Sequence, residues 1–264
     1  MKVELIRDAT RDSGWWLLVD RSEQSFVDTE DPLHLEFEYV QMIGHLLEVA
    51  LPGSAPIVAL HLGGGLCTVP RWLVVRHPGS RQRVIEHSAE IARLAASLGR
   101  IAGTTVKLDD AAVALSRTRP SRFDLVVSDV YEGPETVTGM FTGEALRSAH
   151  RALRPGGLYV CNLSDAVPFA LAKVVAATMR EIFSDVVMLA EPGVLRGRRS
   201  GNIVLAGADR ALPSAELRRR GAANSVRFRV LADTDLTEFI GTTRSVRDGQ
   251  QLPRSGESTG RRLG

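Results

Sequence analysis

The sequence predicts an α/β protein with a doubly wound, mostly parallel β-sheet. This prediction is based on three observations. Strand and helix patterns alternate from residue 57 onward, which is typical of a parallel sheet covered by helices on both faces. The strand at residues 57–62 is followed by Gly63, Gly64 and Gly65, and then by a helix. The next strand ends in an acid, Glu86. Together these elements form the layout of a nucleotide-binding half-fold.

The first 50 residues predict a β-hairpin followed by a helix. Residues 15–19 and 25–27 have strand patterns and are separated by a polar turn at residues 20–23. Apolar residues then recur at spacings of three and four from Leu35 to Ala50, which predicts an amphipathic helix. We therefore expect residues 1–50 to form a small N-terminal region.

Residues 51–210 predict a single Rossmann-like cofactor-binding domain with right-handed crossovers. A pair of later strands, at residues 185–189 and 202–206, is expected to be antiparallel at the sheet edge. The expected parallel strands are residues 57–62, 83–86, 105–108, 123–128 and 158–162, and the expected helices are residues 68–76, 88–98, 111–116, 143–153 and 168–183.

The last part of the chain, residues 211–264, is expected to be a C-terminal extension. Residues 211–240 predict a helix and a strand. From residue 242 onward Arg, Gly, Ser and Gln dominate and apolar residues are sparse, so we expect this end to be largely disordered.

Composition narrows the function classes. The chain has 264 residues, is 44% hydrophobic and carries a net charge of +2, which is too small a charge to indicate a nucleic-acid partner. The two cysteines, Cys67 and Cys161, are far apart and favour neither a disulfide framework nor a metal site. No charged-then-apolar signal segment is visible in the sequence, and no apolar run approaches about 18 residues. We expect a cytoplasmic protein without a membrane partner.

Candidate site residues follow the strands, because ligands of open α/β sheets bind beyond the carboxyl ends of the strands. The glycines at 63–65 let a ligand approach the backbone closely, although turns also contain glycines. The carboxylate of Glu86 can accept both hydrogen bonds of a ribose diol. These residues indicate a nucleoside-bearing cofactor.

Two further strand ends carry acids. Asp110, and less strongly Asp109, follows the third strand, where an acid can meet an adenine amino group or cap the next helix. Asp129 closes the fourth strand, which faces the reacting end of the cofactor, and there it could hold a cation or accept a proton. Glu132 and Glu135 follow in a loop, and we interpret Glu135 as solvated.

Three other polar residues have structural interpretations. His61 lies inside the first strand, and we expect a packed, hydrogen-bonded side chain there. Ser164 and Asp165 follow the fifth strand, where a site role and a helix-capping role are equally compatible with the sequence.

The run from Asp129 to Thr142 resembles the signature of the spermidine synthase (polyamine aminopropyltransferase) family, which has the class I adenosylmethionine-dependent methyltransferase fold. The run has the family's length and ends in a similar way, in Gly139-Met140-Phe141-Thr142. Similar segments are residues 123–127 and 153–157 around it, residues 18–20 with Gln24, residues 38–46 and residues 201–206, so that the resemblance covers roughly residues 15–210.

The resemblance implies the transfer of an aminopropyl group from decarboxylated S-adenosylmethionine to a small amine such as putrescine. Asp129 matches the catalytic aspartate that takes a proton from the amine. Glu132 and Tyr39 match residues near the polyamine, and Gln24 matches a glutamine near the cofactor. The family also implies a possible homodimer through the N-terminal hairpins.

The chain departs from the family at residues near the donor and acceptor. Leu66 stands where the family has an aspartate that binds the aminopropyl tail. Val40 and Gln41 replace a histidine and a glutamate, and Glu132 replaces an aspartate. Three functions therefore stay open: an aminopropyltransferase, a methyltransferase that uses intact S-adenosylmethionine, and a non-catalytic protein that binds adenosine ligands.

Overall fold

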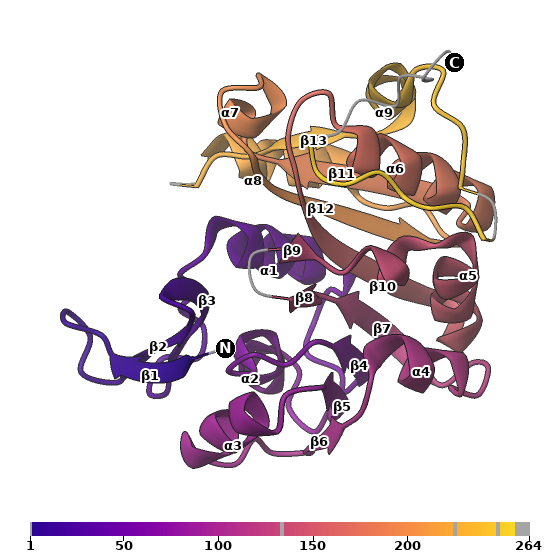
Figure 1. Cartoon of the computed structure of the whole chain (residues 1–264). Helices are drawn as coiled ribbons and strands as arrows, with labels where there is room; N and C mark the ends of the chain where they lie inside the picture. Colours follow the sequence, from indigo (N-terminus) through magenta and orange to yellow (C-terminus); the bar gives the residue numbers. More distant parts are fainter. Residues whose placement is uncertain (1, 133–134, 224–225, 247–248, 257–264) are drawn as a thin grey trace.

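The large sheet of the molecule has helices on both faces, and a small N-terminal sheet packs beside it (Figure 1). The structure is a computed structural model, and it describes residues 2–132, 135–223, 226–246 and 249–256. No helix among these residues has the length and apolar character needed to cross a membrane. The arrangement confirms the predicted α/β class with a mostly parallel sheet.

The large sheet has eight strands in the order β13-β11-β12-β10-β7-β4-β5-β6. The neighbours from β10 to β6 all pair in parallel, and β12 pairs antiparallel to both β10 and β11. The strands are β4 (Val58–Leu62), β5 (Arg81–Glu86), β6 (Thr104–Leu108), β7 (Phe123–Ser128), β10 (Leu153–Asp165), β11 (Asp185–Ala190), β12 (Gly201–Ala208) and β13 (Arg229–Leu231).

Two apolar clusters, one on each face, attach the helices to this sheet. One contains residues of α1, α2 and α8, and the other contains residues of α4, α5, α6 and α9. The helices are α1 (Glu38–Ala50), α2 (Thr68–Arg76), α3 (Ala89–Ser97), α4 (Ala111–Ser116), α5 (Gly143–Ala152), α6 (Ala170–Ile182), α7 (Pro192–Leu195), α8 (Ser214–Ala223) and α9 (Asp233–Ile240), with a 3₁₀ turn at Thr138–Phe141.

The N-terminal region forms a three-stranded antiparallel sheet, one strand more than the predicted hairpin. Its strands are β1 (Val3–Arg7), β2 (Gly14–Val19) and β3 (Ser22–Asp28). Leu17 and Val27 of this sheet pack against Leu66, which follows the glycine turn of the large sheet. This contact places the small sheet beside the carboxyl end of β4. The short ribbon of β8 (Tyr131–Glu132) and β9 (Glu135–Thr136) lies beyond β7.

The late strands pair as predicted but lie differently in the sheet. The pair β11 and β12 is antiparallel, yet β12 is inserted between β10 and β11, and β13 forms the edge beyond β11. The expected Pro-Gly-Gly turn is included in an extended β10, whose register against β7 shifts between Leu153 and Leu158.

The described part of the C-terminal extension packs against the core, a contact that the sequence does not predict. Val246 and Leu252 are each 8% exposed and belong to the same apolar cluster as α6 and α9. The backbone N–H of Val246 donates to Thr178 of α6, and that of Gly256 donates to Asp165. Apolar residues that are sparse in the sequence are therefore sufficient to anchor this segment. Residues 257–264 lie outside the described chain.

Candidate functional site

A cavity of about 280 Å³ lies where β4, β5 and β7 end, bordered by α1 and β3. This is the edge of the sheet at which the fold class binds its ligands. The lining includes seven of the residues that the sequence predicts for the site: Gln24, Tyr39, Gly63, Gly64, Gly65, Glu86 and Asp129.

Asp129 follows β7 directly and is held by two side chains. Tyr39 of α1 donates its hydroxyl to Oδ2 at 3.1 Å, and Asn162 of β10 donates its amide to Oδ1 at 3.0 Å. Burial raises the pKa of the carboxyl, and the two hydrogen bonds, first that of Asn162, oppose this shift without cancelling it. Asp129 is therefore a stronger base than an exposed aspartate.

Tyr39 acts as a neutral donor in this arrangement. Burial, together with the charge of Asp129, holds the pKa of its phenol well above the usual range. The hydroxyl therefore keeps its proton at neutral pH and orients the carboxylate.

Asn162, Asn202 and Tyr131 form a hydrogen-bonded chain behind Asp129 that the sequence analysis missed. The Asn162 amide also donates to Oδ1 of Asn202 at 3.3 Å, and that oxygen accepts from the Tyr131 hydroxyl at 2.9 Å. Both donors of Asn162 thus face acceptors, which sets the orientation of its amide. Its position at the end of the predicted strand 158–162 was a usable signal. No sequence signal pointed to Asn202, because only the insertion of β12 beside β10 brings its side chain to Asn162.

The glycine turn is required by neighbouring protein atoms. A Cβ on Gly63 would lie 2.1 Å from the backbone oxygen of Asp129, and the residue has φ of +89°. A Cβ on Gly65 would lie 3.0 Å from the hydroxyl of Ser25. The absence of side chains therefore lets β3 and the segment after β7 approach the turn. The fold itself requires glycine at these positions, whether or not a ligand binds.

Glu86 is buried and binds the glycine turn through its carboxylate. Oε2 accepts from the backbone N–H groups of Gly64 and Gly65 at 3.0 and 3.3 Å, and Oε1 accepts from that of Ser88 at 2.9 Å. A carboxylate has about four acceptor positions. A ribose diol that donates two hydrogen bonds would therefore replace one of these contacts.

The other predicted residues are distributed differently. Asp110 is exposed, caps α4 through the N–H of Val113 at 2.8 Å, and does not line the cavity, so its adenine role stays a prediction. Gln24 lines the cavity and contacts Ser22. The side chain of Glu132 lies outside the described residues, as does that of Glu135. Asp165 accepts the backbone N–H groups of Ala166 and Ala172 and has a structural role.

The positions where the chain departs from the family lie in two environments. Leu66 is fully buried against Leu17 and Val27 and is absent from the cavity lining. Val40 does line the cavity, whereas Gln41 bonds the backbone oxygen of Glu36. A carboxylate at position 66 would enter an apolar cluster in this chain.

The charged side chains that line the cavity are acidic. Its carboxylates are those of Glu86 and Asp129, and no Lys or Arg is among the described residues that line it. His87, with a side chain 58% exposed, and the buried His61 are its basic side chains. Within the described residues, no cluster of three or more His, Cys, Asp or Glu side chains could hold a metal ion. The site therefore has the charge pattern of a pocket for a cation.

No family model matches the chain. The polyamine aminopropyltransferase of Moorella thermoacetica is 29% identical over 181 residues, which is 64% of this chain and 60% of that protein. This chain therefore matches about three fifths of the length of its curated relative.

Two solved structures share the fold. A spermidine synthase from Thermotoga maritima has a TM-score of 0.60 at 16% identity, with 81% of this chain and 71% of that chain covered. A probable spermidine synthase from Corynebacterium glutamicum has a TM-score of 0.86 at 30% identity, with 95% of each chain covered. A similarity that extends over nearly the whole of both chains at this identity shows that this chain belongs to the spermidine synthase family.

Proposed function

We propose that this protein transfers an aminopropyl group from decarboxylated S-adenosylmethionine to a small primary amine such as putrescine. The observation that carries the proposal is the carboxylate of Asp129, which shares one cavity with the glycine turn and Glu86 and accepts hydrogen bonds from Tyr39 and Asn162. The names of the relatives, polyamine aminopropyltransferase and spermidine synthase, support the same reaction class.

Asp129 has the environment of a general base for this displacement. The neutral nitrogen of the acceptor forms a bond to the terminal carbon of the aminopropyl group. The bond from that carbon to sulfur breaks, and methylthioadenosine leaves with the electron pair. Asp129 accepts the proton that the new secondary ammonium loses, and its raised pKa favours that transfer.

The charge of the cavity supports the decarboxylated donor. A donor with an amine tail brings positive charge and no carboxylate, and the lining supplies Glu86 and Asp129 without a Lys or Arg among the described residues. Intact S-adenosylmethionine would bring a carboxylate that has no such cation to bind it. A charge-assisted hydrogen bond typically contributes about 1.5–3 kcal/mol, so this difference favours the decarboxylated ligand.

The adenosine half of the donor is assigned to the other side of the cavity. Glu86 has one acceptor position beyond its three backbone contacts, which suits a ribose hydroxyl, and Gln24 borders the same space. At about 280 Å³ the cavity lies just below the usual range of roughly 300–1,000 Å³ for small-molecule pockets. Simultaneous binding of donor and acceptor therefore requires it to widen.

The second candidate is a methyltransferase that uses intact S-adenosylmethionine. It stays open because Leu66 stands where the family has the aspartate that binds the aminopropyl tail, so this chain lacks that carboxylate. A thermal-shift panel with methylthioadenosine, decarboxylated S-adenosylmethionine, S-adenosylmethionine and S-adenosylhomocysteine separates the candidates. Larger shifts with the first two support aminopropyl transfer. Larger shifts with the last two support methyl transfer, and no shift with any ligand supports a non-catalytic relative.

The substitution Asp129→Asn tests the base directly. It keeps the side-chain size and removes the proton acceptor, so transfer is expected to fall by about 10²–10⁴-fold. Methylthioadenosine binding, measured by titration, should stay close to that of the wild type. Because burial raises the pKa of Asp129, its ionised form costs stability, and the variant should unfold at the same or a higher temperature. Full activity in Asp129→Asn would contradict the assignment.

A further inference from the structure

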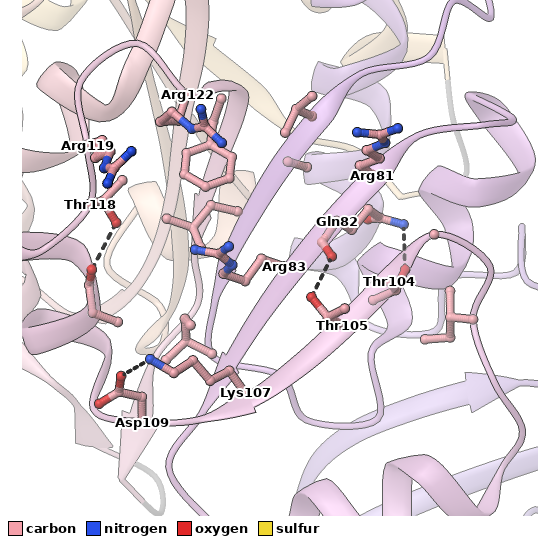
Figure 2. A pocket seen from close by; sticks show the side chains of 18 of the residues that line it. Arg81, Gln82, Arg83, Thr104, Thr105, Lys107, Asp109, Thr118, Arg119 and Arg122 are labelled. Atoms are coloured by element: carbon pink, nitrogen blue, oxygen red, sulfur yellow. Dashed lines mark hydrogen bonds and ion pairs between the residues drawn. The ribbon is translucent and has the colours of Figure 1, made fainter.

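A second and larger groove lies on the face of the sheet that α4 and the loop after it border. Its volume is about 1100 Å³, and it extends over the strands β4, β5 and β6 (Figure 2). Its lining is distinct from that of the cavity at Asp129, with no residue in common. The proposed transfer reaction leaves this groove without a role.

The groove exposes a part of the sheet that a parallel fold normally covers. Strand β5 has a neighbour on each side, β4 and β6, and such strands are usually apolar on both faces. Here Arg81 and Arg83 of β5 line the groove and are exposed, whereas Val84 is buried and does not line it. Helix α4, with six residues, is too short to cover this area.

Positive charge dominates the lining. Figure 2 shows Arg83 of β5 facing the recess toward Arg119 and Arg122, which belong to the loop after α4. The acid of the lining is Asp109, and Lys107 pairs with it at 2.8 Å. The exposed cations around the groove are Arg81, Arg83, Arg100, Lys107, Arg117, Arg119 and Arg122.

The arginines of the groove lack ion-pair partners within the described part of the chain, apart from a longer-range influence of Arg117 on Asp109. Collecting unpaired like charges at one place costs electrostatic energy unless an anion compensates them. Arginine presents several N–H donors in one plane, which matches the oxygens of a phosphate group. The groove therefore has the chemistry of a site for several phosphates.

We propose that this groove binds a nucleoside polyphosphate, with its phosphates contacted by Arg83, Arg119 and Arg122. Half-buried apolar side chains, those of Val58, Ile101 and Ala114, also line the groove and offer contact area for a base. The lining has no exposed aromatic residue on which a run of bases could stack, which disfavours a single-stranded nucleic acid. The end of this chain is an unsuitable occupant, because residues 257–264 contain Arg261 and Arg262 against a single acid, Glu257.

The test is calorimetric titration of the full chain at low ionic strength without Mg²⁺. The probes are ATP, inorganic tripolyphosphate and a single-stranded 12-nucleotide DNA. ATP and tripolyphosphate should both bind, ATP more tightly, and both affinities should weaken as salt screens the charges. Arg83→Glu and Arg122→Glu should each weaken both affinities at least about tenfold, since each replaces an attraction by a repulsion.

Arg93→Glu is the matched control. It makes the same charge change on the exposed face of α3, outside the groove lining, and should change either affinity less than about twofold. Thermal unfolding of each variant shows whether it is folded. The proposal is overturned if neither ATP nor tripolyphosphate binds, or if folded groove variants bind both as the wild type does. It is also overturned if Arg93→Glu causes the same loss, or if only the DNA binds, which would reassign the groove to nucleic acid.

Discussion

At the scale of single residues, opposing effects act on the carboxyl of Asp129, the proposed general base. Burial favours its protonated form, and the amide of Asn162 and the hydroxyl of Tyr39 favour its charged form. Burial is the larger effect, so the carboxyl keeps a raised pKa while both oxygens stay oriented. The proton affinity and the orientation of this carboxyl therefore both depend on side chains from α1 and β10.

Replacing Asn162 should change the pH dependence of the reaction. In Asn162→Leu the largest effect that lowers the pKa of Asp129 is lost, so this pKa rises further. The acid limb of the kcat/KM profile should then move to higher pH, because the base must be deprotonated to act. Tyr39→Phe should shift it in the same direction. Asn202→Leu should shift the acid limb less, because it removes no direct contact with Asp129. An unchanged acid limb in Asn162→Leu would contradict the assigned role.

Leu66→Asp should destabilise the protein without improving the site. The leucine is fully buried with Leu17 and Val27, so a carboxylate there loses apolar packing and is poorly solvated. We expect a loss of at least about 3 kcal/mol in unfolding free energy, measured by urea denaturation. Leu33→Asp is the matched control, because Leu33 is 43% exposed. Tighter binding of decarboxylated S-adenosylmethionine by Leu66→Asp would show instead that position 66 reaches the donor.

At the scale of secondary-structure elements, one buried polar pair connects the strands beneath the site. As the sequence predicts, His61 of β4 is a packed residue, 2% exposed, with Nε2 at 2.8 Å from Oε1 of Gln82 on β5. The Gln82 amide in turn donates to the Pro70 backbone oxygen in α2 at 2.9 Å and to Thr104 of β6. This network joins three strands and a helix, and His61 and Pro70 also line the cavity.

The pair predicts a loss of stability in acid. Burial lowers the pKa of His61 to about 4, whereas an unfolded histidine has a pKa of about 6.5. As the pH falls, the unfolded state therefore binds the proton first. The stability that neutral His61 contributes is fully present above pH 6.5 and is lost between about pH 6.5 and 4, by up to about 3 kcal/mol of unfolding free energy. Urea midpoints at pH 7 and 4.5 should differ less for His61→Asn than for the wild type. An equal pH dependence would mean that other groups cause it.

At the scale of the whole molecule, the last described residues close the core on the face of α6 and α9. Leu252 is buried there although the surrounding sequence is polar. Leu252→Ala should lower the free energy of unfolding by about 2–5 kcal/mol, measured by urea denaturation. Leu33→Ala, at a leucine 43% exposed, should have little effect. Equal stabilities of the two variants would show that the C-terminal segment contributes no packing.

The sequence by itself determined the alternation of strands and helices from β4 to α6 and most of the cavity. Periodicity and turn residues are local signals, so β4, α2 and β7 lie within a residue or two of their predicted bounds. Parallel strands end at one edge of the sheet, so Gly63, Glu86 and Asp129 could be expected together without knowledge of side-chain geometry.

Only the tertiary structure decided the features that depend on non-local pairing. The insertion of β12 beside β10 brings Asn202 to Asn162, and the packing of the N-terminal sheet turns Leu66 away from the cavity. The short α4 leaves the arginines of β5 exposed. The pattern of a strand predicts which of its residues share a face. The neighbouring strands and the helices that cover this face are decided by contacts between segments far apart in the chain.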